Sequence, residues 1–396
     1  MFRNSGLLIK GLTGFLFITA MILFSSCSDD PSSLGSALNQ NNTVQVTTLD
    51  TNKDTIQQYA TSFKKILALG SADRLLLGKT EFLEATTLIK FSLLLEDTYK
   101  NDLDSIEILE AKVNLTNSYS YGDSNGVFDF SAHKVTYNWG YSTFNYDSIG
   151  QLTYDATDIS SERQITDSLI SFKLDVNLVR SWLSDEKLNS SANTFGIYLK
   201  PTDNTRRIYG FWGYSGSLAQ SIQPYITLIL KKGTEYTDTV TYYTLQDIHL
   251  VKGELDQVPK KFIQVQSGLT ANGKLFFDLS GLPSDAIINY AKLTLKMDWA
   301  SSRVGSGYSE GVYAYFAIDT VKNEYDTPVL LERSDNTFSG NIATILNKML
   351  NLKTNNGIVI TPRRPLEGLE MYAIYGFSAV EDTLKPRLNL IYSHRK

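Results

Sequence analysis

The sequence predicts an all-β protein made of two tandem, jelly-roll-like β-sandwiches, each with one short helix. Three features of the chain support this prediction. From Thr43 onward, short segments in which apolar and polar residues alternate recur along the chain, and this period of two is typical of half-buried strands. Tyrosine and phenylalanine occur 23 and 19 times, and aromatic residues favour strands. The order of segments in the first half returns in the second half, which indicates a duplicated module.

Four segments predict the strands of the first half most clearly. Ile89, Phe91 and Leu93 alternate with polar residues, and the segment 111–115 (Ala-Lys-Val-Asn-Leu) alternates in the same way. A third strand is expected directly after Gly196. The fourth follows Pro224, which stands at a strand start, where the missing N–H of proline does least harm.

The second half repeats these segments in the same order. Segment 274–279 matches the strand around Phe91, 291–295 matches 111–115, 357–362 matches 196–201, 375–377 matches 209–211, and Pro386 matches Pro224. We therefore expect module one at 43–232 and module two at 233–396, divided after Lys231-Lys232-Gly233. A signal peptide (1–26) and a flexible tether (27–42) precede them.

One short helix is predicted just before the glycine-led strand of each module. Asp175 caps the first, which carries Val176, Val179, Trp182 and Leu183; Ser339 caps the second, which carries Ile342, Ile345, Leu346 and Met349. Spacings of three and four place these apolar residues on one stripe of each helix. We expect both helices to cover the open end of a sandwich.

Module one is longer than module two between its Ala-Lys strand and its helix. The distance from Ala111 to Asp175 is 64 residues, whereas that from Ala291 to Ser339 is 48. The additional residues lie within 116–172. Because surface loops tolerate insertions and often carry function, this segment is where a specialised site is expected.

The N-terminus has the pattern of a secretory signal. Arg3 and Lys10 precede an uncharged stretch of 14 residues and two serines, and such a stretch is too short to span a membrane as a helix. The segment that ends in Cys27, the only cysteine, resembles the lipobox of bacterial lipoproteins, and Phe24 resembles the looser boxes of Bacteroidota. The resemblance implies acyl chains on Cys27, and two or more chains hold a protein firmly to a membrane.

The residues after Cys27 predict a location. Ser28-Asp29-Asp30 resembles the acidic signal that sends Bacteroidota lipoproteins to the outer face of the outer membrane, and the periplasmic face is the alternative. The segment 30–35 also resembles the start of a Bacteroidota lipoprotein family of unknown function. Residues 28–42 are rich in serine, asparagine and aspartate, a composition typical of flexible linkers.

Charge and cysteine content exclude several classes of protein. The formal net charge is −5 and becomes about −7 without Arg3 and Lys10, and no basic cluster is present, so nucleic acid is not expected as a partner. With Cys27 acylated, neither a disulfide framework nor a thiolate metal site can form. The three histidines lie more than a hundred residues apart. We predict no cofactor and no metal site built on histidine or cysteine.

The order of features in module one resembles the tandem β-sandwich modules called DNRLRE domains, which are related to a carbohydrate-binding module family. The shared features are the early strand with Lys90-Phe91, the alternating strand at 111–115, Trp139 followed by 143–146, the capped helix, and the last two strands. The hexapeptide that names the family is absent, and module two has no tryptophan matching Trp139. The resemblance implies glycan binding by module one.

Four aromatic residues of the long segment of module one are the candidate ligand site. Tyr119, Tyr121, Trp139 and Tyr141 would form a glycan platform if their ring faces were exposed in a row. The alternative is that the rings fill the end of the core, as large aromatic residues commonly do. Coplanar exposed rings in a groove would favour glycan binding, and buried rings would favour a structural role.

Acidic residues suggest two further kinds of site. Asp123, Asn125 and Asp129, with Gly126, supply the oxygen ligands and the turn glycine of a calcium loop, although turn chemistry alone accounts for them. A glycoside hydrolase would need two carboxylates about 5–10 Å apart. The acids available for that are Asp147, Asp155, Asp158 and Glu162, none of which lies in a catalytic motif.

Three functions from different classes follow from the sequence. The first is a non-catalytic surface lipoprotein that binds glycan or cell-surface material. The second is a structural or adhesion lipoprotein that makes protein contacts in an envelope assembly. The third is a glycan hydrolase.

Overall fold

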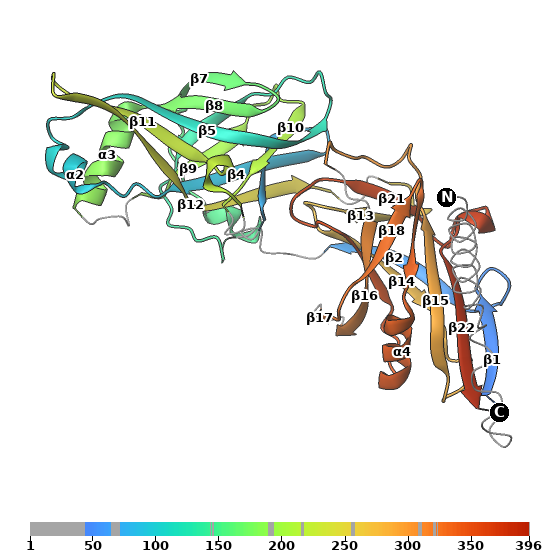
Figure 1. Ribbon diagram of the computed structural model, residues 1–396. Helices are drawn as coiled ribbons and strands as arrows, with labels where there is room; N and C mark the ends of the chain where they lie inside the picture. Colours follow the sequence, from blue (N-terminus) through green and yellow to red (C-terminus); the bar gives the residue numbers. More distant parts are fainter. Residues whose placement is uncertain are drawn as a thin grey trace, which may run out of the picture.

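The computed structural model describes residues 44–64, 72–142, 144, 146–188, 194–214, 218–254, 258–307, 311–319, 322 and 324–395. Within these residues the protein is all-β, and two antiparallel sheets each curl around an apolar core (Figure 1). The predicted fold class is confirmed. The predicted signal peptide, Cys27 and the tether lie outside the described residues. In the described part, no helix is long and apolar enough to cross a membrane.

The first sandwich is built from ten described strands. Its core contains large apolar side chains such as Phe130, Phe172 and Trp182. The strands are β3 (Arg74–Lys79), β4 (Leu83–Phe91), β5 (Glu107–Gly122), β6 (Phe130–Lys134), β7 (Ser160–Ile165), β8 (Leu169–Leu174), β9 (Ile197–Pro201), β10 (Arg207–Trp212), β11 (Tyr225–Lys232) and β12 (Tyr236–Gly253).

The second sandwich is built from twelve described strands around a core that includes Phe316 and Phe338. Its strands are β1 (Val44–Asp50), β2 (Gln58–Lys64), β13 (Phe262–Gln266), β14 (Ala271–Phe277), β15 (Ile287–Lys296), β16 (Gly311–Asp319), β17 (Glu324–Tyr325), β18 (Val329–Ser334), β19 (Thr337–Asn341), β20 (Ile358–Pro362), β21 (Met371–Tyr375) and β22 (Arg387–Arg395).

The strand registers of the two sandwiches match, which confirms the duplication. Ile89 lies opposite Ile197 in the first sandwich, and Leu275 lies opposite Ile358 in the second. A glycine with positive φ, 83° at Gly196 and 88° at Gly357, precedes each of the two isoleucines. A Cβ at Gly196 would lie 2.1 Å from the Ile89 carbonyl oxygen, so glycine is required for this close approach.

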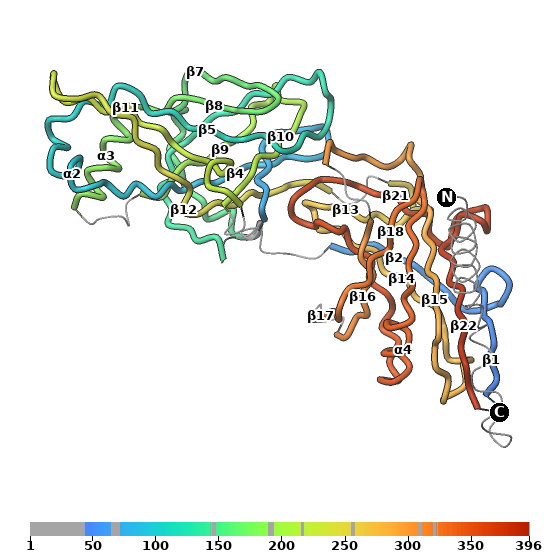
Figure 2. Tube along the Cα trace, in the orientation of Figure 1, coloured from blue at the N-terminus to red at the C-terminus, as the bar shows by residue number. Residues whose placement is uncertain are grey.

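The strands that close the two sandwiches are exchanged between the predicted modules. Strands β1 and β2, which precede module one in the chain, pair with β22 and β14 of the second sandwich. Strand β12, which follows the predicted boundary, pairs with β11 and β4 of the first sandwich. Figure 2 shows the blue N-terminal strand beside the red C-terminal strand. The predicted division, with module one at 43–232 and module two at 233–396, is therefore wrong for these segments.

A tight turn explains why the predicted boundary failed. Gly233, with a φ of 49°, lies in the turn that joins β11 to β12, and Glu235 donates its N–H to the Lys232 carbonyl at 2.9 Å. The turn produces a hairpin with β11, in register from Lys232–Tyr236 to Tyr225–Tyr243. The Lys-Lys-Gly sequence thus marks a hairpin and not the end of a domain.

Helix α3 (Val176–Lys187) begins as predicted, because the Asp175 side chain accepts a hydrogen bond from the Asn177 N–H at 2.8 Å. Helix α4 (Ala343–Leu352) begins later than predicted. Ser339 lies in β19, and Asn341 instead accepts a hydrogen bond from the Ala343 N–H at 3.1 Å. Ser339 as the cap is therefore wrong, because β19 extends two residues beyond it. The described short helices also include α2 (Asp97–Asp102), η2 (Tyr146–Gln151), η4 (Gln220–Ile222) and η5 (Asp382–Leu384).

The additional length of module one lies between β6 and β7. Residues 135–159 connect these strands, whereas only 320–328 connect β16 to β18. The longer connection packs on the outer face of the sheet, where Val135, Trp139 and Phe144 form a small apolar cluster with Leu88 and Tyr198. The segment singled out in the sequence is thus an additional packing layer.

Candidate functional site

Three of the four predicted ligand-binding rings are buried. Tyr119, Tyr121 and Trp139 are 3%, 6% and 5% exposed, and only Tyr141 is open to solvent, at 51%. Trp139 lies in the cluster under residues 135–159, and its indole N–H donates to the Phe195 carbonyl at 2.8 Å. The row of exposed rings that a glycan platform requires is not formed by these residues, because the additional layer and the second sandwich cover them.

Tyr119 joins the two sandwiches. Its hydroxyl accepts a hydrogen bond from the Leu369 N–H at 3.1 Å, and its ring lies so close to Gly305 that a Cβ there would be 2.4 Å from it. Next to it, the Ser306 N–H donates to the Ser120 carbonyl at 2.8 Å. Tyr119 and Leu369 belong to one buried cluster that draws apolar side chains from both sandwiches. Tyr119 is therefore part of the junction.

A buried arginine and a buried glutamate flank Tyr119. The Arg74 guanidinium lies 5.0 Å from the centre of the Tyr119 ring and donates to the Glu367 carbonyl at 2.6 Å. Burial lowers the pKa of Arg74, and burial raises the pKa of Glu370. Burial also raises the pKa of Tyr119 well above its usual value. Charges at such depth are costly unless they are paired and hydrogen-bonded, so the two sandwiches must stay docked for these groups to keep their partners.

The predicted calcium residues form a turn and an ion pair. Asp123 accepts a hydrogen bond from the Asn125 N–H at 2.9 Å, and Asp129 lies 3.7 Å from Arg163. Among the described residues, no three His, Cys, Asp or Glu side chains gather as a metal site would require. The local turn accounts for Asp123 and Asn125, and Asp123, Asn125 and Asp129 do not come together as calcium ligands.

Two of the acids considered for hydrolysis, Asp158 and Glu162, have structural partners for their carboxylates, and Asp155 contributes a backbone contact. Asp158 accepts hydrogen bonds from the Ala132 and Ser160 N–H groups, and these outweigh the effect of burial and hold its pKa below the usual value. Glu162 pairs with Lys173 at 2.7 Å. The Asp155 carbonyl lies 3.0 Å from the His133 ring. The Asp147 side chain lies outside the described part of the structure.

A cleft of about 530 Å³ opens at one end of the second sandwich, between α4 and the loop that follows β14. The loop supplies Leu279, Leu282 and Pro283, and the C-terminal part of α4 supplies Met349 and Leu350. The complete lining is Phe276, Asp278, Leu279, Ser280, Leu282, Pro283, Ser284, Met349, Leu350, Lys353, Thr354 and Asn355. The ring of Phe276 is stacked on that of Tyr59, with centroids 4.7 Å apart. The size is typical of pockets that hold small ligands or side chains.

Most polar groups at the rim of this cleft already have partners within the protein. The Asn355 amide donates to the Phe277 carbonyl at 2.7 Å and accepts from the Gly357 N–H at 3.3 Å. Asp278 accepts from the Ser280 N–H at 3.0 Å, and Thr354 donates to the Leu352 carbonyl at 3.0 Å. The walls are largely apolar, and the Asn355 amide is paired at both ends within the protein, whereas Ser284, Lys353 and the carboxylate of Asp278 also border the cleft.

The sequence analysis did not identify this cleft, although the chain contains a signal for it. Fifteen residues (92–106) connect β4 to β5, whereas nine (278–286) connect the equivalent strands β14 and β15. The longer connection contains α2 and places Leu103 and Ile106 in the first core. Comparing connection lengths between the two copies would have shown that the second sandwich lacks this cover.

A second hollow, of about 460 Å³, lies at the junction of the sandwiches. Tyr121 and Asp123 line it together with Phe82, Arg206 and Arg303. The Arg303 guanidinium lies 4.2 Å from the centre of the Phe82 ring. Two of the predicted site residues therefore border a hollow, but they do so with arginines that the sequence did not indicate.

Comparison with known proteins does not place the chain in a family. No family model and no curated protein matches it. A solved structure of the pilus backbone protein RrgB from Streptococcus pneumoniae aligns with 83% of the chain at 6% identity, with a TM-score of 0.12. The alignment spans 54% of the length of that protein. The fold and the sites described above stand without support from a relative.

Proposed function

We propose that the protein is a lipid-anchored envelope lipoprotein that makes contacts with other proteins, and that its two sandwiches act as one rigid unit. The observation that supports this proposal is the burial of Tyr119, Tyr121 and Trp139 at 3%, 6% and 5% exposure. Buried rings are what a structural role requires, and Tyr119 holds the junction between the sandwiches.

The position of β1 gives this proposal a geometry. Sixteen residues lie between Cys27 and Val44, a stretch that spans at most about 60 Å when extended. Val44 begins a strand on the edge of the second sandwich, paired with Arg395. With acyl chains on Cys27, the second sandwich is the nearer of the two to the membrane. The first sandwich lies farther away, although most of its strands come earlier in the chain.

Fractionation tests the anchor, and cross-linking tests the contact. We expect Cys27→Ser to move the protein from the membrane fraction to the soluble fraction, and we expect a discrete cross-linked complex in intact cells that is lost in the same variant. Unchanged partitioning of Cys27→Ser would contradict the anchor. If the membrane-anchored protein forms no cross-linked complex in intact cells, the proposed role in protein contacts would be contradicted.

Glycan binding is the second candidate, and the hollow at the junction favours it. Arginine, aspartate and aromatic side chains line this hollow, and such groups can hydrogen-bond the hydroxyls of a sugar and pack on its ring. A glycan array with the soluble fragment 28–396 tests this alternative. If the protein binds a glycan on the array and the double variant with Arg206→Ala and Tyr121→Ala does not, glycan binding would be favoured over protein contact.

A further inference from the structure

We infer that the cleft beside α4 binds an apolar turn of a partner polypeptide. This inference rests on the proposed function, because it names the kind of partner that the lipoprotein contacts. The comparison of the two sandwiches supports it: the first fills this end of its core with its own residues, and the second leaves the corresponding end partly open.

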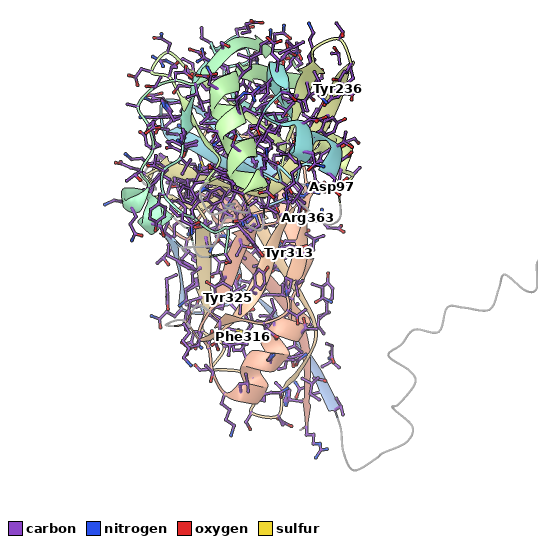
Figure 3. All side chains as sticks on the ribbon, turned by 90° about the vertical axis from the view of Figure 1, so that its left-hand side faces the viewer. Asp97, Tyr236, Tyr313, Phe316, Tyr325 and Arg363 are labelled. Carbon is purple, nitrogen blue, oxygen red and sulfur yellow. The ribbon has the colours of Figure 1, made fainter. Side chains whose placement is uncertain are left out.

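The filled end in the first sandwich shows what the cleft accommodates. Leu103 and Ile106 are 2% and 3% exposed and belong to the first core. Arg180, in the second turn of α3, donates to the carbonyls of both residues, at 3.1 Å for Leu103. Leu103 and Ile106 thus close this end of the first sandwich. Their side chains, three residues apart, enter the core, and their carbonyls face α3. Asp97 of α2 and Tyr236, labelled in Figure 3, mark the side of the first sandwich where this cover lies.

The second sandwich closes this end only in part with its own described residues: Leu279 is buried and Leu282 packs on the core, and the cleft stays open beside them. Asn347 stands in α4 where Arg180 stands in α3, and it bonds the backbone of Ile288 instead, donating at 2.8 Å and accepting at 2.8 Å. Met349 stands where α3 has the larger Trp182. Since the preceding connection is also six residues shorter, the apolar walls formed by Leu282 and Leu350 are left open to a partner.

The rim of the cleft favours a polypeptide over a sugar. Leu282, Met349 and Leu350 give the walls apolar surface, and the Asn355 amide is already paired at both ends, whereas a sugar needs several polar groups that converge on its hydroxyls. Apolar side chains make no such demand, and their burial is favourable because it removes apolar surface from water. The chemistry of the walls thus matches leucine and isoleucine side chains.

The position of the cleft indicates where the partner lies. Asp285 belongs to the connection 278–286, which lines the cleft. It accepts a hydrogen bond from the Arg395 N–H at 2.9 Å, and Arg395 pairs with Val44. The cleft therefore lies close to the point where the chain arrives from Cys27. An envelope protein at the same membrane would be within reach of it.

The direct test uses a synthetic peptide of residues 95–106 as the probe and the soluble fragment 28–396, which contains every described residue, as the receptor. We expect saturable binding, with a dissociation constant on the order of 0.1–1 mM because ordering an isolated peptide costs conformational entropy. Leu350→Glu should weaken binding at least tenfold. Leu352→Glu is the matched control, since Leu352 is 52% exposed, lies on the same helix and does not line the cleft.

A second variant protects the test against misfolding. Ser284 is exposed at the rim of the cleft, so Ser284→Trp should block the peptide without removing a core contact. A peptide with Leu103→Asp and Ile106→Asp should not bind. Equal binding by Leu350→Glu, Ser284→Trp and Leu352→Glu, or no binding by any of them, would overturn the inference. Tighter binding of dodecanoate at the same site would assign the cleft to a lipid and overturn it as well.

The two proposals fail in different experiments. The peptide titration is done in solution and does not depend on the anchor, so its failure leaves the fractionation result untouched. If the peptide binds but Cys27→Ser stays in the membrane, the cleft stands and the lipoprotein assignment falls.

Discussion

The first sandwich is closed by β12, which follows it directly in the chain, whereas the second is closed by β1 and β2, which lie some two hundred residues before the rest of it. Both closing strands run antiparallel to the equivalent strand of their sandwich. Thr239 lies opposite Ile229 in the first sandwich, and Thr48 lies opposite Ile391 in the second. In the first sandwich the single strand β12 pairs with both β11 and β4. In the second sandwich two strands, β1 and β2, pair with β22 and β14, and a loop of residues 51–57 separates them. The duplicated module thus tolerates a closing strand supplied from either side.

The largest effect is expected from removing the closing strands of the second sandwich alone. Deletion of 44–64 should abolish cooperative unfolding of the second sandwich, a loss on the order of 5 kcal/mol or more, because Leu49, Ile56 and Ala60 pack on its core. The first sandwich should stay folded. Hydrogen exchange should show lost protection in β14 and β22 and retained protection in β4 and β11. A deletion of 28–43 is the control and should change neither.

The second comparison concerns a position at which the first sandwich has a buried acid and the second sandwich has an alanine. Asp247 lies opposite Ile89, and Ala60 lies opposite Leu275 at the matching position of the second sandwich. Burial raises the pKa of Asp247 to about 7, and one N–H, from Tyr214, opposes that shift.

Because the folded pKa of Asp247 exceeds its unfolded value, its contribution to stability is complete below about pH 4 and is lost as the pH rises to about 7. The free energy of unfolding of the first sandwich should fall by roughly 4 kcal/mol over that range. Denaturant titrations should show this fall and its disappearance in Asp247→Asn. A variant that keeps the same pH dependence would show that another group is responsible.

The junction gives a smaller and more local effect. Gly305→Ala should cost about 1–3 kcal/mol, because the new methyl group would meet the Tyr119 ring at 2.4 Å. Gly281→Ala is the matched control, since a Cβ there meets nothing within 4 Å. Thermal unfolding of the two variants should differ by several degrees. Equal melting temperatures would mean that the sandwiches are not held together at Tyr119.

The smallest expected effects concern the two side chains that accept a hydrogen bond at the start of each helix, Asp175 and Asn341. Asp175→Ala should destabilise the first sandwich by about 1 kcal/mol, and Asn341→Ala should destabilise the second by a similar amount. Ser339→Ala should cost less than about 0.5 kcal/mol, because Ser339 lies in β19 and does not cap α4. Chemical denaturation of the three variants measures these differences. A larger loss for Ser339→Ala than for Asn341→Ala would reverse the assignment.

The fold class and the duplication could be predicted because they depend on local patterns. The period of two at 111–115 and 291–295 is present in the sequence itself, and both segments form strands that occupy equivalent positions. The exchange of closing strands could not be predicted in this way, because β1 and β12 have similar alternating patterns and each could pair with β11 or β22. The choice depends on where the chain turns, at Gly233.

The candidate site was harder to predict because burial depends on tertiary partners. Tyr119 and Tyr141 look alike in the sequence, yet one lies in the junction and the other is open to solvent. The residues that cover Tyr119, including Gly305 and Leu369, come from the other half of the chain. The cleft beside α4 was missed because its signal is a missing segment, visible only when 278–286 is compared with 92–106.

A disulfide test measures the exchange of closing strands directly, in the Cys27→Ser background. Cysteines at Thr48 and Ile391, which lie opposite each other in β1 and β22, should form an intramolecular disulfide in the monomeric protein. Cysteines at Thr48 and Ile229, the equivalent position of the first sandwich, should remain reduced. A disulfide between 48 and 229, with 48 and 391 left as thiols, would contradict the exchanged architecture and the membrane-proximal position of the second sandwich.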